Sequence, residues 1–391
     1  MTRNNYTCGI DIGTHTTRVV VIGHDKNKND CLLAIGQSHT EGMRLGYITN
    51  VEQVAKSVKK AIEQAEKMLG SKIRHAYVSI GGISLSSQTS TGTVIISKAD
   101  QEITHLDISK AMALCEEDIE LLNRKIIHII PIGFKLDGKD IHGKPEGMHG
   151  TKLEVKTLFI TCLKQNIEDI VTALALINIE VKDIVASPIA SSFVLLNHKQ
   201  KVAGCVLIDI GAETVSISCF ENNTLISLQV FSIGSMDITK DVALGFKIAL
   251  EEAESIKIGS VVGGDYSKKK VSEIIEARLI DIFELVQNHL KKIKRNELLA
   301  AGAIITGGGS QINEIEDIAK SQLKLPARVG PMDSTMVNKF KMRDSSWYTA
   351  LGLALGERDG VSTKNNIHGG INDQVKEIKD FFKNILSQLL P

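Results

Sequence analysis

The sequence has little of several features that would narrow its function at once. Acidic and basic residues balance, with 46 of each among 391 residues, so no net positive charge favours nucleic acid as a partner. No stretch approaches the roughly 20 consecutive apolar residues of a membrane-spanning helix. The six cysteines are scattered and form no Cys-x-x-Cys pair. This spacing excludes the usual zinc motifs and favours reduced thiols in a cytosolic compartment.

Two common phosphate-binding motifs are missing as well. No Gly-x-Gly-x-x-Gly follows the first predicted strand, and the chain has no Walker A lysine motif. One short pattern instead occurs twice, as "IDIGTHTTRVVVI" at 10–22 and "IDIGAETVSISCF" at 208–220. Each copy is typical of a strand, a polar turn and a second strand. The pair predicts an internal duplication in an α/β chain of more than one domain.

The repeated pattern places a carboxylate inside an apolar strand, where it is unfavourable without a partner. If the two turns face each other, their backbone amides can hold a polyphosphate. Asp11 and Asp209 would then hold Mg²⁺ directly or through water, because this ion prefers oxygen ligands. The alternative is a pair of unrelated hairpins with similar turns. We expect the first interpretation, since both copies occur in matching contexts.

Two further patterns are expected at the same site. Glu254 and Lys257 in "AESIK" share one helix face and could contact ribose or adenine, although such a pair is often only a surface ion pair. The run "ITGGGS" puts three glycines between a strand and a helix, where backbone can approach a ligand closely. The predicted nucleotide-binding residues are Asp11, Gly13, Thr14, Thr16, Thr17, Asp209, Gly211, Glu213, Thr214, Gly234, Glu254, Lys257, Gly307, Gly308, Gly309 and Ser310.

The order Asp-Ile-Gly-Thr, Asp-Ile-Gly, Ala-Glu-x-Ile-Lys and Gly-Gly-Gly resembles the actin, heat-shock chaperone and sugar-kinase superfamily. Within it, "GQSHTEGMRLGYITNVEQVAKSV", "AYVSIGGISLSSQTSTGTVII" and "DIVASPIASSFVLL" are similar to the FtsA family of bacterial cell-division proteins. The resemblance covers essentially the whole chain. It implies an α/β, actin-like fold of two duplicated domains around a nucleotide cleft, with an α+β subdomain inserted in the first half. The implied cofactors are ATP and Mg²⁺.

The resemblance also implies a division of the chain into subdomains. Subdomain 1A is expected at 1–84 and 166–198, the inserted 1C at 85–165, 2A at 199–227 and 300–356, and 2B at 228–299. A flexible linker, 357–372, and an amphipathic membrane-targeting helix, 373–391, would follow.

Residues 187 and 188 depart from the superfamily pattern. Relatives that hydrolyse ATP well usually have Glu-Pro where this chain has Ser187-Pro188. Serine is too short and too weak a base to replace that glutamate directly. We therefore expect ATP to be a structural ligand that is hydrolysed slowly or not at all.

The last stretch, "DQVKEIKDFFKNILSQLLP", places apolar residues along one helix face. Such a helix can lie in a bilayer interface, or it can pack against its own core. Its neutral charge indicates weak membrane binding by one copy, strengthened when copies assemble into a filament. The residues expected in the membrane are Phe381, Phe382, Ile385, Leu386 and Leu389.

The resemblance implies partners and a location too. The protein would polymerise with itself on the inner face of the cytoplasmic membrane at the division site. It would anchor the ring of the tubulin-like protein FtsZ by binding the FtsZ C-terminal tail, and contact other division proteins through 1C. Arg278 matches a family arginine at the FtsZ contact and suits a carboxylate-bearing peptide; alone, it reads as an exposed helix arginine.

Two other functions stay open at this point. One is a PilM-like, ATP-binding role in type IV pilus assembly, which shares the fold but lacks the C-terminal helix. The other is a small-molecule kinase of the same superfamily, for which no catalytic base motif is found.

Overall fold

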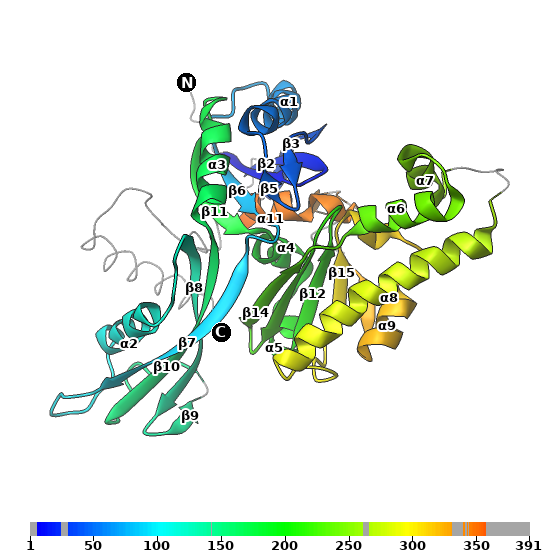
Figure 1. The fold of residues 1–391 in the computed structure, drawn as a ribbon. Helices are drawn as coiled ribbons and strands as arrows, with labels where there is room; N and C mark the ends of the chain where they lie inside the picture. The colour runs from blue at the N-terminus through cyan, green and yellow to red at the C-terminus, as the bar shows by residue number, and fades with distance from the viewer. Residues whose placement is uncertain are drawn as a thin grey trace.

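The computed structural model describes residues 6–24, 30–141, 143–260, 266–330, 339–340, 342 and 344–356. The predicted linker and amphipathic helix, 357–391, lie outside these residues. The described part contains two five-stranded sheets, one four-stranded sheet and one two-stranded sheet, together with the helices that cover them. Figure 1 shows the four-stranded sheet projecting from the body. None of the described helices is both long and apolar enough to span a membrane.

The first sheet has the strand order β11-β6-β1-β2-β3. Strands β1, β2 and β3 run antiparallel as a meander, whereas β6 and β11 continue the sheet in parallel. The central strand β1 is buried over most of its length, as expected of a strand covered on both faces. Its strands are β1 (Tyr6–Ile12), β2 (Thr16–His24), β3 (Asp30–His39), β6 (His75–Ile80) and β11 (Glu180–Ala186).

The second sheet repeats this topology in the order β14-β13-β12-β15-β16. Again three strands form an antiparallel meander and two continue in parallel. The register also repeats, because Asp11 pairs with Arg18 and Asp209 pairs with Ser216, seven residues on in each case. The predicted duplication is therefore confirmed. Its strands are β12 (Cys205–Ile210), β13 (Val215–Glu221), β14 (Thr224–Phe231), β15 (Gly302–Thr306) and β16 (Ala327–Val329).

Helices cover the first sheet on both faces (Figure 1). Helix α1 (Val51–Leu69) packs on β2 and β3; its N-cap Asn50 accepts from Gln53, and it ends at Gly70, whose φ is 72°. Helix α11 (Tyr348–Gly356) packs on β1 and on α4 (Ser187–Leu195). This contact places the end of the described chain against the first half, although the sequence predicts it with 2A. The remaining small elements here are β4 (Met43–Arg44), β5 (Tyr47–Ile48), α3 (Lys164–Ala175), α5 (His198–Ala203) and η2 (Ser345–Trp347).

The smaller sheet, β7-β10-β8-β9, is built from the range predicted as an insertion. It has its own apolar core with helix α2 against one face. Ser87 ties it to the second half, since its Oγ donates to the Leu228 carbonyl at 2.6 Å. The elements are β7 (Ser86–Ile95), α2 (His105–Glu117), β8 (Arg124–Leu136), β9 (Lys139–Ile141) and β10 (Lys152–Leu163).

The second sheet carries its own helices, which Figure 1 shows on the side away from the insertion. The long helix α8 buries an apolar stripe that includes Leu279, Phe283 and Val286. These helices are α6 (Ser235–Phe246), α7 (Leu250–Lys257), α8 (Lys268–Lys292), η1 (Gly308–Gln311) and α9 (Ile315–Leu323). The six cysteines are free and five are buried, as the sequence predicts.

Candidate functional site

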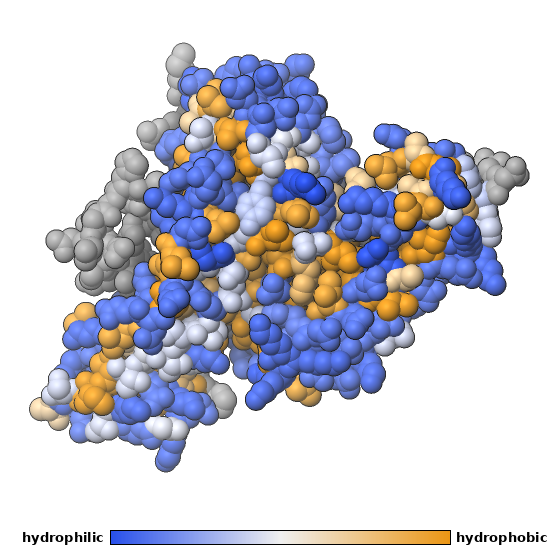
Figure 2. All heavy atoms as spheres, viewed as in Figure 1, coloured by the Kyte–Doolittle hydropathy of each residue, from blue (hydrophilic) through white to orange (hydrophobic). Residues whose placement is uncertain are grey.

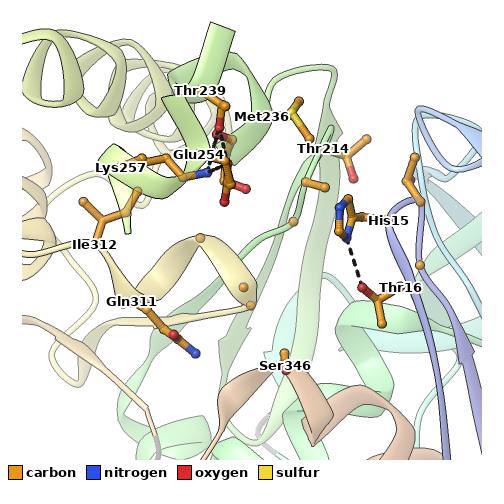
Figure 3. A pocket seen from close by; sticks show the side chains of 18 of the residues that line it. His15, Thr16, Thr214, Met236, Thr239, Glu254, Lys257, Gln311, Ile312 and Ser346 are labelled. Atoms are coloured by element: carbon orange, nitrogen blue, oxygen red, sulfur yellow. Dashed lines mark hydrogen bonds and ion pairs between the residues drawn. The ribbon is translucent and has the colours of Figure 1, made fainter. Parts of the chain in front are cut away.

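A pocket of about 1190 Å³ lies between the two halves of the molecule. The β1–β2 turn, the β12–β13 turn, the glycines after β15, and helices α6 and α7 all contribute to its wall. On the face seen in Figure 2, apolar residues gather in the middle of the molecule and hydrophilic residues surround them. Figure 3 shows side chains from both halves directed into the pocket. This volume is slightly above the roughly 300–1,000 Å³ of most small-molecule pockets.

The two repeated carboxylates lie in this pocket, close enough to affect each other. Removal from solvent raises the pKa of Asp209 to about 7, and the charge of Asp11 adds to this effect. Desolvation also raises the pKa of Asp11, although Ser79 Oγ donates to its Oδ1 at 2.6 Å and Arg18 lies nearby. Two acids held together and away from water are poorly compensated by the protein alone. The pair is therefore suited to a divalent cation.

Gly307 brings the third predicted loop against the second carboxylate. Its φ is 86°, and a Cβ at this position would lie 2.3 Å from Asp209 Oδ1. Glycine is thus required both by the backbone and by the close approach. Next to it, Thr306 pairs with Asp209 in the sheet, and its buried hydroxyl has no hydrogen-bond partner among the described residues. Thr306 does not line the pocket, so the groups that face a ligand here are the Asp209 carboxylate and the Gly307 backbone.

The opposite wall carries an ion pair between a buried lysine side chain and a partly exposed carboxylate. Lys257 Nζ lies 2.7 Å from Glu254 Oε2, and the lysine also donates to Thr239 Oγ1 at 2.8 Å. Burial would raise the pKa of Glu254, but the hydrogen bonds from Lys257 and Thr239 outweigh burial and hold it below its usual range. Figure 3 shows these side chains facing the β1–β2 turn across the pocket. Glu254 therefore presents a charged carboxylate to any ligand between the two walls.

The structure brings most of the predicted nucleotide-binding residues together and leaves four outside the lining. The predicted residues that line the pocket are Asp11, Gly13, Thr14, Thr16, Asp209, Gly211, Thr214, Glu254, Lys257, Gly307, Gly308 and Gly309. The other four have different roles. Thr17 is buried, and its hydroxyl forms a hydrogen bond with the Thr40 hydroxyl. The Ser310 hydroxyl donates to the Gly307 carbonyl. Glu213 accepts from the Leu45 amide, and Gly234 packs behind the second turn.

Several lining residues were not predicted from the sequence. His15, Ser79 and Met236 all line the pocket, as does Arg18. The buried Nε of Arg18 has no hydrogen-bond partner within the described ranges, and the guanidinium lies 5.7 Å from the Trp347 ring. An unpartnered cationic donor beside two acids suits an anionic ligand. Of these four residues, only Arg18 could be predicted from the sequence. A hairpin with a four-residue turn after Ile12 pairs Arg18 with Asp11.

These observations test whether a magnesium–nucleotide complex fits. The two acids with raised pKa values and the unpartnered Arg18 Nε all line the pocket, and they suit a cation bound together with a phosphate chain. The close backbone at Gly307 adds a surface without side chains. Three or more metal-binding side chains do not cluster anywhere in the described part of the chain. A cation here would therefore rely on phosphate and water for its other ligands.

The predicted FtsZ contact lies outside the pocket lining. Arg278 is not a free surface arginine, because its Nε and Nη2 donate to Asp241 at 2.6 and 3.0 Å and its Nη1 lies 3.3 Å from Asp281. A carboxylate-bearing peptide would have to compete with Asp241 for this group. The predicted membrane residues, from Phe381 to Leu389, lie outside the described residues.

Two sheets of equal topology that enclose one acidic pocket define the actin-like class of proteins. Solved structures agree with this fold. The PilM–PilN type IV pilus biogenesis complex matches with a TM-score of 0.67 at 15% identity, over 89% of this chain and 97% of that one. MreB5 of Spiroplasma citri bound to ADP matches with a TM-score of 0.50 at 12% identity, over 94% and 100%.

Sequence comparisons identify the family. The family model described as cell division protein FtsA matches residues 206–352, and the SHS2 domain inserted in FTSA matches residues 82–161. The cell division protein FtsA of Bacillus subtilis is 29% identical over 374 residues, which cover 90% of this chain and 83% of that protein. That of Pseudomonas aeruginosa is 28% identical over 384 residues, covering 90% of each. The chain belongs to the FtsA family.

Proposed function

We propose that the protein is an ATP-binding, actin-like cell-division scaffold. It polymerises on the inner face of the cytoplasmic membrane, anchors the FtsZ ring through the FtsZ C-terminal tail, and contacts other division proteins through the inserted subdomain. Similarity to cell-division proteins across most of the chain supports the cell-division role more strongly than the pilus role. The PilM likeness, at 15% identity, extends to the fold alone.

The observation that carries the nucleotide proposal is the pair of matching acidic turns at one pocket. Asp11 and Asp209 hold the magnesium ion, and Arg18 and the turn amides hold the phosphates. Glu254 and Lys257 contact the nucleoside. The neighbour MreB5 is described as bound to ADP, which supports a nucleotide in a cleft of this fold.

ATP acts in this proposal as a structural ligand. Ser187 lies in the pocket lining, at the start of α4, and is the residue at the position where active relatives carry a glutamate. A serine hydroxyl is a poor base for activating water. We therefore expect turnover far below the rates of about 1–10³ per second that are usual for enzymes. The kinase alternative has less support, because no catalytic base motif is found in the sequence.

Electron microscopy of the purified protein on lipid monolayers tests the scaffold proposal. With magnesium and ATP, we expect filaments on the monolayer, and fewer or none without nucleotide. Asp209→Asn should fail to assemble while still folding, because it removes one cation ligand and keeps the side-chain shape. Filaments that form equally well without nucleotide and with Asp209→Asn would contradict the proposal.

A further inference from the structure

His15 occupies a position where the two repeats have diverged. The ungapped alignment pairs His15 in the first turn with Glu213 in the second. Glu213 is directed at the Leu45 amide and does not line the pocket, whereas His15 does. Figure 3 shows the imidazole at the pocket wall, beside Thr16 and below Thr214. The first turn thus contributes an ionisable side chain to the pocket where the second turn does not.

The imidazole is exposed, and two contacts orient it. Its Nδ1 lies 3.1 Å from Thr16 Oγ1, and its ring meets the ring of His39 edge to face, with centroids 4.9 Å apart. The structure gives its Nε2 no hydrogen bond to any described residue. A ring fixed through Nδ1 and packed against a second ring keeps Nε2 available to a ligand.

The charges around His15 come from three elements. Burial lowers its pKa, and His39 on β3, Arg18 on β2 and Lys257 on α7 lower it further, while Glu254 on α7 opposes them. At neutral pH the imidazole is therefore mostly uncharged when no ligand is bound. A polyphosphate chain would add several negative charges to the same space. Such charges favour the imidazolium form and can accept its N–H.

We propose that His15 binds the phosphate chain of the nucleotide and takes up a proton as that chain binds. This inference rests on the proposed nucleotide-binding function and adds a residue and a proton to it. Because binding is then tighter to the protonated imidazole, the contribution of His15 to affinity rises as the pH falls. Asp209 works in the opposite direction, since it must lose a proton to hold the cation. A comparison of variants is needed to separate the two groups.

Isothermal titration calorimetry with magnesium–ATP, in two buffers of different ionisation enthalpy, measures both affinity and proton uptake. We expect the wild type to take up more protons than His15→Asn at about pH 7. The affinity ratio of wild type to His15→Asn should be about fivefold to tenfold near pH 6 and about twofold or less near pH 8. His198→Asn changes an exposed histidine outside the pocket lining and should keep the proton uptake.

A second variant guards against a purely structural effect. His15→Lys carries a permanent charge, so it should bind magnesium–ATP at least as tightly as the wild type near pH 8 and show no His15-dependent proton uptake. Equal proton uptake and parallel pH profiles for wild type and His15→Asn would overturn the inference about His15 and leave nucleotide binding standing. Failure of the wild type to bind magnesium–ATP at any pH would overturn both.

Discussion

Glu213 and Leu45 join the two halves of the molecule beside the pocket. The Glu213 carboxylate, on the β12–β13 turn, accepts a hydrogen bond at 2.6 Å from the backbone N–H of Leu45, between β4 and β5. Met43 and Gly46, on either side of Leu45, line the pocket. A ligand between the halves therefore meets a wall whose position depends on this contact.

Removal of the Glu213 contact should loosen the wall. We expect Glu213→Ala to weaken magnesium–ATP binding by about fivefold, in keeping with about 1 kcal/mol for one hydrogen bond. Hydrogen exchange at the Leu45 amide should become faster. Glu213→Gln retains an acceptor oxygen and should stay close to the wild type. Equal affinity and unchanged exchange in Glu213→Ala would contradict this role.

The raised pKa of Asp209 predicts a pH-dependent stability of the ligand-free protein. Because the folded-state pKa is about 7 and the unfolded value is about 4, this group stabilises the fold fully only below about pH 4. That stability is lost as the pH rises to about 7. Asp209→Asn cannot ionise, so it should melt at a higher temperature than the wild type near pH 8, with a gain in the free energy of unfolding on the order of 4 kcal/mol.

Thermal melts with and without magnesium–ATP check this prediction. The advantage of Asp209→Asn should shrink toward pH 4, and added magnesium–ATP should stabilise only the wild type. If Asp209→Asn is less stable than the wild type near pH 8, other groups of the folded protein must stabilise the ionised Asp209 carboxylate.

The ion pair between Arg278 and Asp241 predicts competition at the expected FtsZ contact. Release of the guanidinium by Asp241→Asn should tighten binding of an FtsZ C-terminal peptide, by about tenfold if the peptide carboxylate takes its place. Arg278→Ala should weaken it. Asp281→Asn is the matched control, because Asp281 is more exposed and lies farther from the arginine. Fluorescence anisotropy with a labelled peptide measures the affinity of all three variants. Equal affinities would show that Arg278 is not part of the contact.

The apolar pattern of residues 373–391 predicts membrane binding that depends on two aromatic side chains. Phe381→Asp combined with Phe382→Asp should abolish sedimentation with liposomes, since apolar insertion must supply most of the affinity of a neutral segment. A double aspartate change at Ile367 and Ile371, in the predicted linker, adds the same charge outside the helix and should sediment like the wild type. Equal pelleting of all three proteins would favour a helix packed on its own core.

Much of the fold could be predicted because the duplication repeats both composition and spacing. The two Asp-Ile-Gly turns, the helix after Asn50 and the strand–glycine–helix unit at Gly307 all follow from local sequence signals. The sequence predicts Thr17 at the nucleotide site, but Thr17 lies outside the pocket lining, because side chains alternate along a strand. Since Thr16 faces the pocket, Thr17 must point to the other side, where it contacts Thr40.

Other features depend on contacts that local sequence does not specify. Ser79 reaches Asp11 only because β6 lies beside β1, and the return of α11 to the first sheet depends on the packing of both halves. The ion pair between Arg278 on α8 and Asp241 on α6 joins two residues that are 37 positions apart along the chain. Such contacts follow from the order of strands and helices in space, which periodicity alone does not define.

The central claim is that Asp11 and Asp209 jointly hold one magnesium–nucleotide complex between the two halves. Calorimetric titration of the wild type, Asp11→Asn and Asp209→Asn with ATP, in the presence of magnesium or of EDTA, tests this most directly. We predict one nucleotide per chain for the wild type, and at least about tenfold weaker binding when magnesium or either carboxylate is removed. Binding that is indifferent to magnesium and equally tight in both variants would contradict the account.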